Sequence, residues 1–201
     1  MRFAPLNLAS RPFSSCSEGK EVALEFRLIY EGPLHGQENP GRVQHKHAIR
    51  RHFHPQLRQL WERHDFLKRN LDYFAGRYER DGFRYVPLVN SQQGRFCALD
   101  LLVLWRNTPG NIVRAGGDID NRIKVLFDAL RMTTHKRELD GAAPQADEDP
   151  FFCLLEDDRL ITDFRVTTDY LLKPIPSSGT VDDVVVLIAV RTGSIDLDDR
   201  D

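Results

Sequence analysis

The stretch Gly117-Asp118-Ile119-Asp120-Asn121-Arg122-Ile123-Lys124, which continues into Phe127-Asp128-Ala129-Leu130, carries the strongest structural signal in this chain of 201 residues. Its apolar residues recur with the period of an amphipathic helix, so the stretch predicts a helix over residues 119–132 with one face in the core. The predicted core face comprises Ile119, Ile123, Leu126, Phe127 and Leu130, and an adjoining face carries Asp120, Lys124, Asp128 and Arg131.

Two carboxylates stand two residues apart at the start of this helix. Side chains at i and i+2 point roughly 200° apart on a helix, so Asp118 and Asp120 converge only if Asp118 precedes the first turn. Gly116-Gly117 would allow that bend, and a second acidic pair, Asp157-Asp158, precedes a strand-like run. Carboxylate oxygens are ligands that suit Mg²⁺ or Mn²⁺. The alternative is that Asp118 caps the helix and Asp120 interacts with its dipole.

Two segments together resemble the RusA family of Holliday junction resolvases. The first is Asp118-Ile119-Asp120-Asn121, with Lys124 and Phe127-Asp128-Ala129-Leu130, and the second runs from Leu155 through Asp157-Asp158 to Asp163-Phe164-Arg165-Val166. That family carries a D-x-D-N-x-x-K-x-x-x-D-A-L helix, then a D-D pair leading into a strand with D-[YF]-R. The match covers roughly residues 117–168, about a quarter of the chain.

The resemblance implies a Mg²⁺-dependent endonuclease that acts as a homodimer on branched DNA in recombination and repair. Carried over by position, Asp118, Asp120 and Asp158 correspond to the metal-binding aspartates and Lys124 to the essential lysine. Asn121 corresponds to the asparagine beside the aspartates, which we place among the DNA-binding candidates, and Asp157 is a weaker candidate. The connector of residues 131–154 is longer than that family's, and Arg114-Ala115-Gly116-Gly117 stands where members often place several arginines.

Composition predicts an ordinary soluble chain. It is 41% hydrophobic and 29% charged with a net charge of -2, and no apolar run is long enough to span a membrane. Residues 1–20 lack the apolar core of a secretory signal. Three widely spaced cysteines, Cys16, Cys97 and Cys153, indicate a reducing, cytoplasmic compartment and no disulfide framework.

A basic segment over residues 42–69 is the best candidate for contacts with DNA phosphates, although charged helix faces are often only solvated. We predict DNA contacts for Lys46, Arg50 and Arg51. The segment also holds His45, His47, His52 and His54, but positions 45 and 47 diverge on a helix and no cysteine is near. We therefore expect an exposed or DNA-facing cluster rather than a zinc site.

The remaining pattern predicts a small mixed α/β (α+β) domain over residues 21–192, with a flexible segment 1–20 and an acidic tail 193–201. Strands are expected at 21–30, 83–89, 96–105, 160–172 and 181–191, with 83–89 and 96–105 forming a hairpin across the polar turn 90–94. Residues 44–66 are expected to be helical, with a kink or a new start at Pro55, and 67–81 to continue as helix. Residues 133–154 are poorly patterned and expected to be partly mobile.

The resulting hypothesis is a Mg²⁺-dependent, structure-selective endodeoxyribonuclease with Asp118, Asp120, Lys124 and Asp158 at its site. Lys124 has a purely structural alternative as an i, i+4 partner of Asp120 or Asp128, contributing about 0.3–0.5 kcal/mol. A non-catalytic DNA-binding relative is the first alternative function. The second is a metal-dependent phosphoryl or sugar-phosphate transferase, against which the absence of a Gly-rich phosphate loop argues. The apolar strands at 96–105 and 181–191 leave room for a homodimer interface, unless the N-terminal helical segment covers them.

Overall fold

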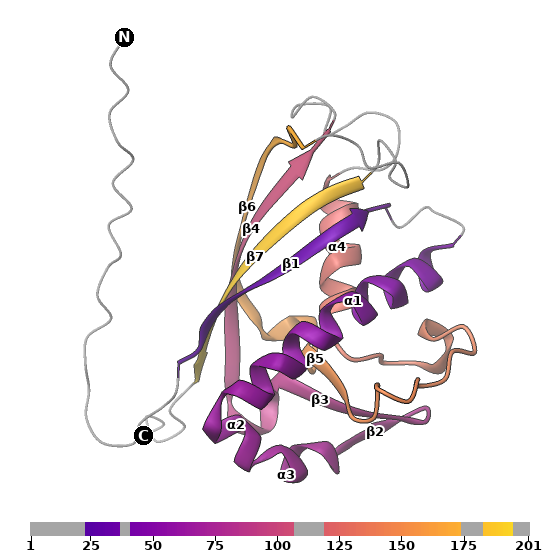
Figure 1. The fold of residues 1–201 in the computed structure, drawn as a ribbon, viewed down its shortest axis with the longest axis vertical. Coiled ribbons are helices and arrows are strands. Elements are labelled where there is room, and N and C mark those ends of the chain that lie inside the picture. Colours follow the sequence, from indigo (N-terminus) through magenta and orange to yellow (C-terminus); the bar gives the residue numbers. More distant parts are fainter. Residues whose placement is uncertain (1–22, 37–40, 107–118, 174–182, 195–201) are drawn as a thin grey trace.

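The chain folds into two β-sheets with helices between and beside them, as the computed structural model in Figure 1 shows, which confirms the predicted mixed α/β class. The structure describes residues 23–36, 41–106, 119–173 and 183–194. The expected flexible segment 1–20 and the loop 107–117 lie outside these ranges, as does most of the expected acidic tail. Gly193 and Ser194, which were assigned to that tail, belong instead to the last strand.

The larger sheet has the strand order β1-β7-β4-β6, with bounds Glu25–Pro33 (β1), Asp183–Ser194 (β7), Arg95–Trp105 (β4) and Ile161–Tyr170 (β6). Strand β7 is antiparallel to both of its neighbours, and β6 is parallel to β4. Alternate residues of β4 and β7 are buried, as expected for strands with one face in the core. The predicted strands at 21–30, 96–105, 160–172 and 181–191 are therefore confirmed, with shifted ends.

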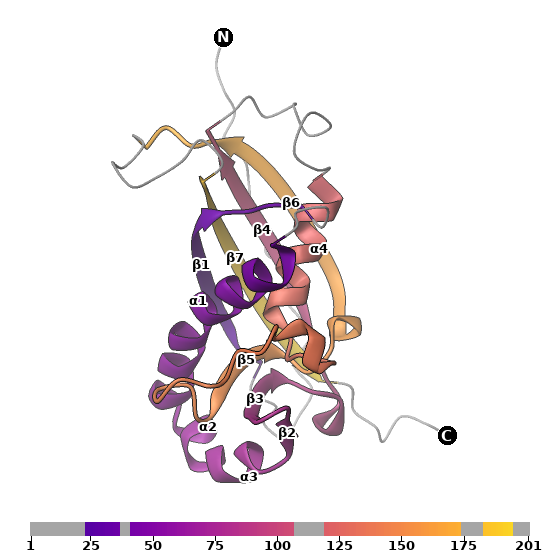
Figure 2. The same ribbon diagram turned by 90° about the vertical axis from the view of Figure 1, so that its right-hand side faces the viewer.

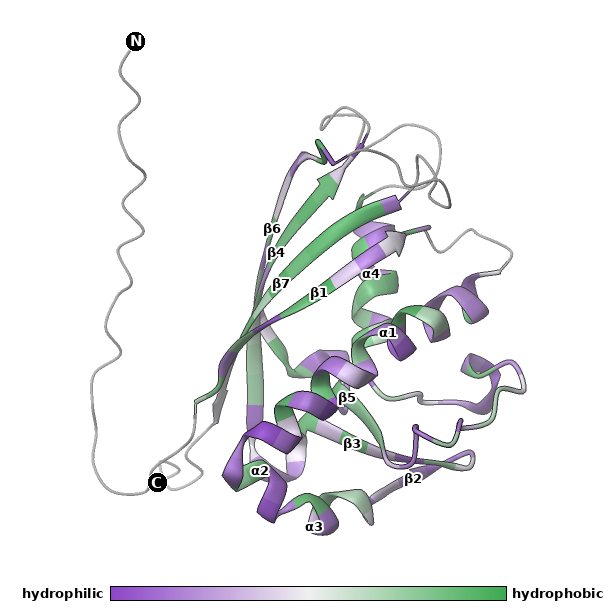
Figure 3. Cartoon of the chain, in the orientation of Figure 1, coloured by the Kyte–Doolittle hydropathy of each residue, from purple (hydrophilic) through white to green (hydrophobic). Residues whose placement is uncertain are grey.

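Two long helices cover one face of this sheet, as Figure 2 shows from the side. Helix α1 spans Arg42–Arg63 and passes through Pro55 without a break, and helix α4 spans Ile119–Leu130 as predicted. Apolar side chains of both helices and of the inner sheet face form one core. Figure 3 colours the hydrophobic residues of these elements green along the ribbon. No described element covers the opposite face of the sheet.

The smaller sheet has the order β2-β3-β5, over Tyr78–Arg80, Phe83–Val89 and Phe151–Leu155. The predicted hairpin between residues 83–89 and 96–105 is wrong, because β3 pairs with β2 and β5 while β4 belongs to the other sheet. A short 3-10 helix, η1 (Ser91–Gln93), redirects the chain between the two sheets. The predicted helix over 67–81 is also shorter, since α2 (Asp65–Arg69) and α3 (Leu71–Ala75) are followed by β2.

The connector after α4 is tied to the rest of the molecule, contrary to the expectation of partial mobility. It contains the 3-10 helix η2 (Lys136–Glu138) and leads into β5, a strand that the sequence pattern did not reveal. The buried carboxylate of Glu148 pairs with Arg51 on α1 at 2.7 Å, and the His54 ring, also on α1, contacts the Asp147 carbonyl at 3.1 Å. A third 3-10 helix, η3 (Asp158–Leu160), joins β5 to β6.

None of the described helices is both long enough and apolar enough to cross a membrane.

Candidate functional site

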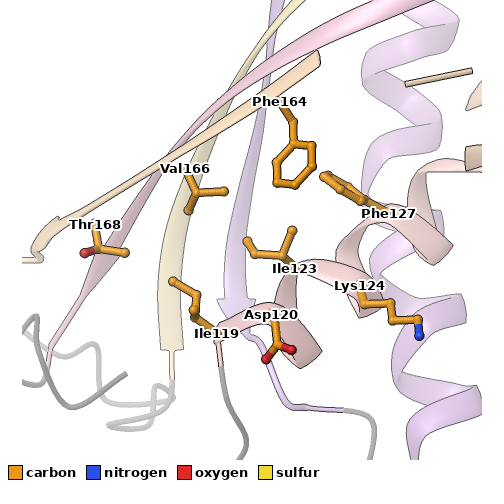
Figure 4. Close-up of a pocket in the computed structure, with 8 residues that line it drawn as sticks. All are labelled: Ile119, Asp120, Ile123, Lys124, Phe127, Phe164, Val166 and Thr168. Atoms are coloured by element: carbon orange, nitrogen blue, oxygen red, sulfur yellow. The ribbon is translucent and has the colours of Figure 1, made fainter. Parts of the chain in front are cut away.

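A groove lies between helix α4 and strand β6, which run past each other in opposite directions. The Phe127 and Phe164 rings meet edge to face, with centroids 5.3 Å apart. Further along, Ile123 and Ile119 of α4 line the same groove as Val166 and Thr168 of β6, as Figure 4 shows. The hollow has a volume of about 430 Å³, within the range of small ligand sites.

Asp120 and Lys124 lie at the rim of this groove. They are one helical turn apart on the same face of α4, and both side chains are exposed. The backbone N–H of Asn121 donates to Asp120 Oδ1 at 2.8 Å, which fixes the carboxylate in the first turn. Within the described part of the chain, Lys124 has no ion-pair partner, so neither Asp120 nor Asp128 holds it as a structural i, i+4 salt bridge.

The second acidic pair lies at the other end of α4. The backbone N–H of Met132, just beyond the helix, donates to the Leu155 carbonyl at 2.9 Å, and Asp157-Asp158 follow two residues later. Because β6 then runs antiparallel to α4, it leads away from this pair toward Asp120. The helix rises by about 15 Å between Asp120 and Leu130. One chain therefore does not bring Asp158 to Asp120, and Asp118 lies outside the described residues.

The two neighbouring aspartates at this end have different surroundings. Asp157 accepts hydrogen bonds from the backbone N–H of Arg159 at 3.0 Å and from its guanidinium at 2.9 and 3.1 Å. These bonds, chiefly those of the guanidinium, lower the pKa of Asp157 to about 2. Asp158 is exposed. Asp157 thus acts as the cap of η3, and Asp158 is the residue open to a ligand.

The fit of a metal ion to these residues is incomplete. Over the ranges that the structure describes, no group of three or more His, Cys, Asp or Glu side chains converges. Asp120 supplies one oxygen donor group at the start of α4, and Asp158 supplies another at the far end. The predicted site of three carboxylates is not formed by the described residues of a single chain.

The basic residues predicted to bind DNA are largely occupied within the fold. Arg50 is 1% exposed, and its guanidinium donates to the backbone carbonyls of Arg131 at 3.0 Å and Asp128 at 2.9 Å. The Nη2 atom of the same guanidinium lies 3.7 Å from Oε2 of Glu138. The position of Arg50 contradicts the prediction of a DNA contact for this side chain. It stabilises the carboxyl end of α4, where a cation is favoured.

Lys46 and Arg51 each have a carboxylate partner. The Lys46 ammonium lies 3.0 Å from Asp128, and both side chains are mostly buried. Arg51 pairs with the buried Glu148, as described above. These contacts join α1 to α4 and to the connector, so a phosphate would have to compete with an existing ion pair at either position.

The histidine cluster is also partly buried, which corrects the expectation of an exposed group. His47 and His54 are 5% and 3% exposed. The His54 ring accepts from the backbone N–H of Phe152 at its Nδ1, so its Nε2 carries the proton that the Asp147 carbonyl accepts. Burial, and then the charges of Arg50 and Arg51, lower the pKa of His47 to about 4. Both rings serve as neutral core side chains.

Sequence reasoning did not identify the β6 side of the groove. Phe164 is 56% exposed although it faces an apolar hollow, and Val166 and Thr168 complete that wall. The alternation of β6 indicated a strand, but only the structure shows that the strand is an edge and which helix it faces. An aromatic residue between two charged ones, Asp163-Phe164-Arg165, was the available signal.

Comparison with known proteins gives no assignment, since no family model, no curated protein and no solved structure matches this chain.

Proposed function

We propose that this protein is a structure-selective endonuclease that resembles the RusA family, acts on branched DNA and requires Mg²⁺, with Mn²⁺ as a substitute. The observation that carries the proposal is the placement of Asp120 and Lys124 one turn apart on the same face of α4, at the rim of a groove. A carboxylate for a cation and an ammonium for a phosphate are the side chains that phosphodiester hydrolysis needs close together.

The chain's own residues have separate tasks in this proposal. Asp118 and Asp120 would hold the metal ion, which when bound supplies Lewis acidity and lowers the pKa of its water. Lys124 would place a positive charge beside a bound phosphate. Asn121, in the same turn as Asp120, would contact the DNA strand near that phosphate.

The separation of Asp120 from Asp158 supports a homodimer as the active form. If both carboxylates serve one site, as the resemblance implies, Asp158 has to come from a second copy of the chain. A two-fold axis that brings the beginning of one α4 beside the end of the other would form two such sites at once. A four-way junction has two-fold symmetry, so two symmetric sites match two symmetric cuts.

The alternative of a non-catalytic DNA-binding relative has one observation in its favour. Over the described ranges, no three carboxylates converge, so these residues of one chain lack the metal site that cleavage requires. Such a relative would bind branched DNA without cutting it. A phosphoryl or sugar-phosphate transferase is less well supported, because the groove is lined mainly by apolar side chains and only Asp120 and Lys124 among its lining residues are charged.

Digestion of synthetic DNA tests the proposal. Four-way junctions, forks and linear duplex of the same sequence are incubated with the protein in Mg²⁺ or in EDTA. We expect cutting of the branched substrates in Mg²⁺ alone. Asp120→Asn and Lys124→Ala should each reduce the rate at least about 100-fold, since each removes a charge that acts on the reacting phosphate. Lys136→Ala, at an exposed lysine on η2 outside the basic segment, is the matched control. Binding without any cleavage would favour the non-catalytic alternative.

A further inference from the structure

Strand β6 is an open edge of the larger sheet. Among the described strands it pairs only with β4, and seven of its ten residues are exposed. The backbone N–H of Leu171 donates to the Trp105 carbonyl of β4. Because successive residues of a strand face opposite edges, the N–H and C=O of Phe164 and Val166 point toward the open side. Natural proteins rarely leave a long edge strand unprotected, so this edge is a candidate for pairing with another strand.

The charges on β6 complement themselves. Asp163 and Arg165 are exposed on the sheet face opposite α4, and within the described part of the chain neither has an ion-pair partner. In an antiparallel pair of two identical strands centred on Phe164, Asp163 of each copy stands opposite the partner's Arg165. A centre at Arg165 would oppose the two arginines, and a centre at Val166 would oppose Asp163 to the partner's Asp169. A centre at Thr167 would pair Arg165 with the partner's Asp169 but would leave Asp163 opposite Leu171, beyond the end of β6. Among these registers, only the centre at Phe164 gives both Asp163 and Arg165 a partner of opposite charge.

The aromatic residue at that centre also fits a second copy of itself. Phe164 is 56% exposed and borders the apolar groove. A symmetric interface requires a surface that complements itself, with a projecting group and a hollow on the same patch. The exposed ring of Phe164 supplies the projecting group. The groove that it borders with Phe127 supplies the hollow.

We propose that two copies of this chain associate through antiparallel pairing of their β6 edges about Phe164, with Asp163 of each copy opposite the partner's Arg165. The paired residues are Thr162 to Val166, since the irregularity where β4 passes from Cys97 to Ala98 ends the regular part of β6. The sheet continues across the two copies, and the two α4 helices lie side by side in opposite directions.

This register rests on the homodimer of the proposed function and specifies its geometry. Thr168 borders the groove beside Ile119 and Asp120, and in this register it stands opposite the partner's Leu160. The carboxylate of Asp120 and the partner's Asp158 then lie toward the same end of the joined groove.

Charge reversal tests the register through light scattering at micromolar concentration. The unchanged protein should have twice the chain mass. Asp163→Arg and Arg165→Asp, made singly, should each raise the dimer dissociation constant at least about 100-fold, because each opposes like charges at both symmetric positions. Glu25→Arg and Arg27→Asp reverse exposed charges on the same sheet face in β1, at the other edge of the sheet, and should leave the dimer intact.

Mixing the two single variants gives the sharpest result. A chain with arginine at 163 and 165 complements a chain with aspartate at both positions. Each variant should therefore be a monomer alone, whereas their equimolar mixture should contain a heterodimer. The double reversal in one chain should restore the homodimer. A monomeric mixture, or single variants that stay dimeric, would overturn the proposed register.

Disulfide trapping locates the two-fold axis. Directly opposed residues in an antiparallel pair have Cα atoms about 4.5–5.5 Å apart, within reach of a disulfide. Phe164→Cys in a Cys16→Ser background should cross-link to itself on oxidation, whereas Val166→Cys, which faces the partner's Thr162, should not. Cys97 and Cys153 are buried, and burial raises the pKa of both thiols, so they contribute no background.

The outcomes separate this inference from the proposed nuclease function. A dimer with these properties that cuts no DNA supports the register and contradicts the nuclease. A protein that cuts branched DNA but is monomeric, or whose dimer is indifferent to the reversals, overturns the register alone.

Discussion

At the scale of single residues, the most informative side chain is the buried guanidinium of Arg50. It joins helix α1 to the last turn of α4 through two backbone carbonyls and to η2 through Glu138. Glu138 in turn contacts Arg131 at 3.3 Å and accepts a hydrogen bond from the Thr134 hydroxyl at 2.5 Å. Burial alone would raise the pKa of Glu138, but the Thr134 bond and the two arginine charges lower it overall.

Arg50→Ala should therefore unfold the protein rather than weaken its DNA binding selectively. Removing one partner of a buried charged network typically costs about 3–5 kcal/mol, because the remaining groups stay buried without compensation. Urea denaturation followed by circular dichroism measures the loss. Arg63→Ala, an exposed arginine on the same helix, should change stability by less than about 0.5 kcal/mol. A stable Arg50→Ala protein with reduced affinity for junctions would contradict this role.

His47 should make the fold sensitive to mild acid. Its pKa is lowered from 6.5 to about 4, so between these values the unfolded chain binds a proton that the folded chain excludes. The stability contributed by the neutral ring is complete above pH 6.5 and is lost as the pH falls toward 4. Between pH 7 and pH 4.5, the free energy of unfolding should fall in both proteins. The fall should be smaller in His47→Leu than in the parent by roughly 1–3 kcal/mol, since one pKa unit corresponds to about 1.4 kcal/mol.

Melting curves across that pH range provide the measurement. His52→Leu, an exposed histidine on the same helix, is the control and should keep the parent's pH profile. Identical profiles for the parent and His47→Leu would show that the ring is not a buried neutral group.

At the scale of elements, the connector between α4 and β5 behaves as part of the core. The Glu148 carboxylate forms an ion pair with Arg51 and accepts a hydrogen bond from the backbone N–H of Gln145. Leu139 packs with Phe83 and Phe151. We expect slow hydrogen exchange at the amides of Met132 and Ala142, whose N–H groups donate to Leu155 and Leu139. Glu148→Ala should accelerate exchange in peptides covering 139–149, and Asp147→Ala, at an exposed neighbouring acidic residue, should not. Rapid exchange at these amides in the parent would instead support the expectation that the connector is mobile.

Local pattern was sufficient to predict α4 and the strands β3, β4, β6 and β7, because each is long and has a clear period. It was insufficient where an outcome depends on distant contacts. The basic segment suggested a DNA surface, but the carboxylate and backbone-carbonyl partners of Lys46, Arg50 and Arg51 are 78 or more positions away and no local rule identifies them. The same holds for the acidic residues: the sequence places Asp120 and Asp158 in a common motif, whereas the antiparallel course of β6 separates them.

At the scale of the whole molecule, the separated carboxylates predict complementation between inactive variants. If Asp120 and the partner's Asp158 share a site, a mixed dimer of Asp120→Asn and Asp158→Asn chains has one intact site and one doubly altered site. Each variant alone should be inactive, and their mixture should nick branched DNA at up to about a quarter of the parent rate, since half of the dimers are mixed and each keeps one of two sites.

Nicking by the equimolar mixture, after brief denaturation and refolding together, is the observable. Two Asp120→Asn preparations mixed in the same way are the control. A mixture as inactive as its components would place both carboxylates in one chain or remove Asp158 from the site.

The two tryptophans of this protein occupy contrasting positions, and that contrast offers an optical probe. Trp61 is 1% exposed in the core, whereas Trp105 is only half-buried at the end of β4, with the Arg122 guanidinium 4.9 Å from its ring centroid. Arg122 lies in the same helical turn as Asp120. A ligand that draws Arg122 away would change the emission of Trp105 and leave that of Trp61 constant, so fluorescence of Trp61→Phe and Trp105→Phe proteins can separate events at the groove from unfolding of the core.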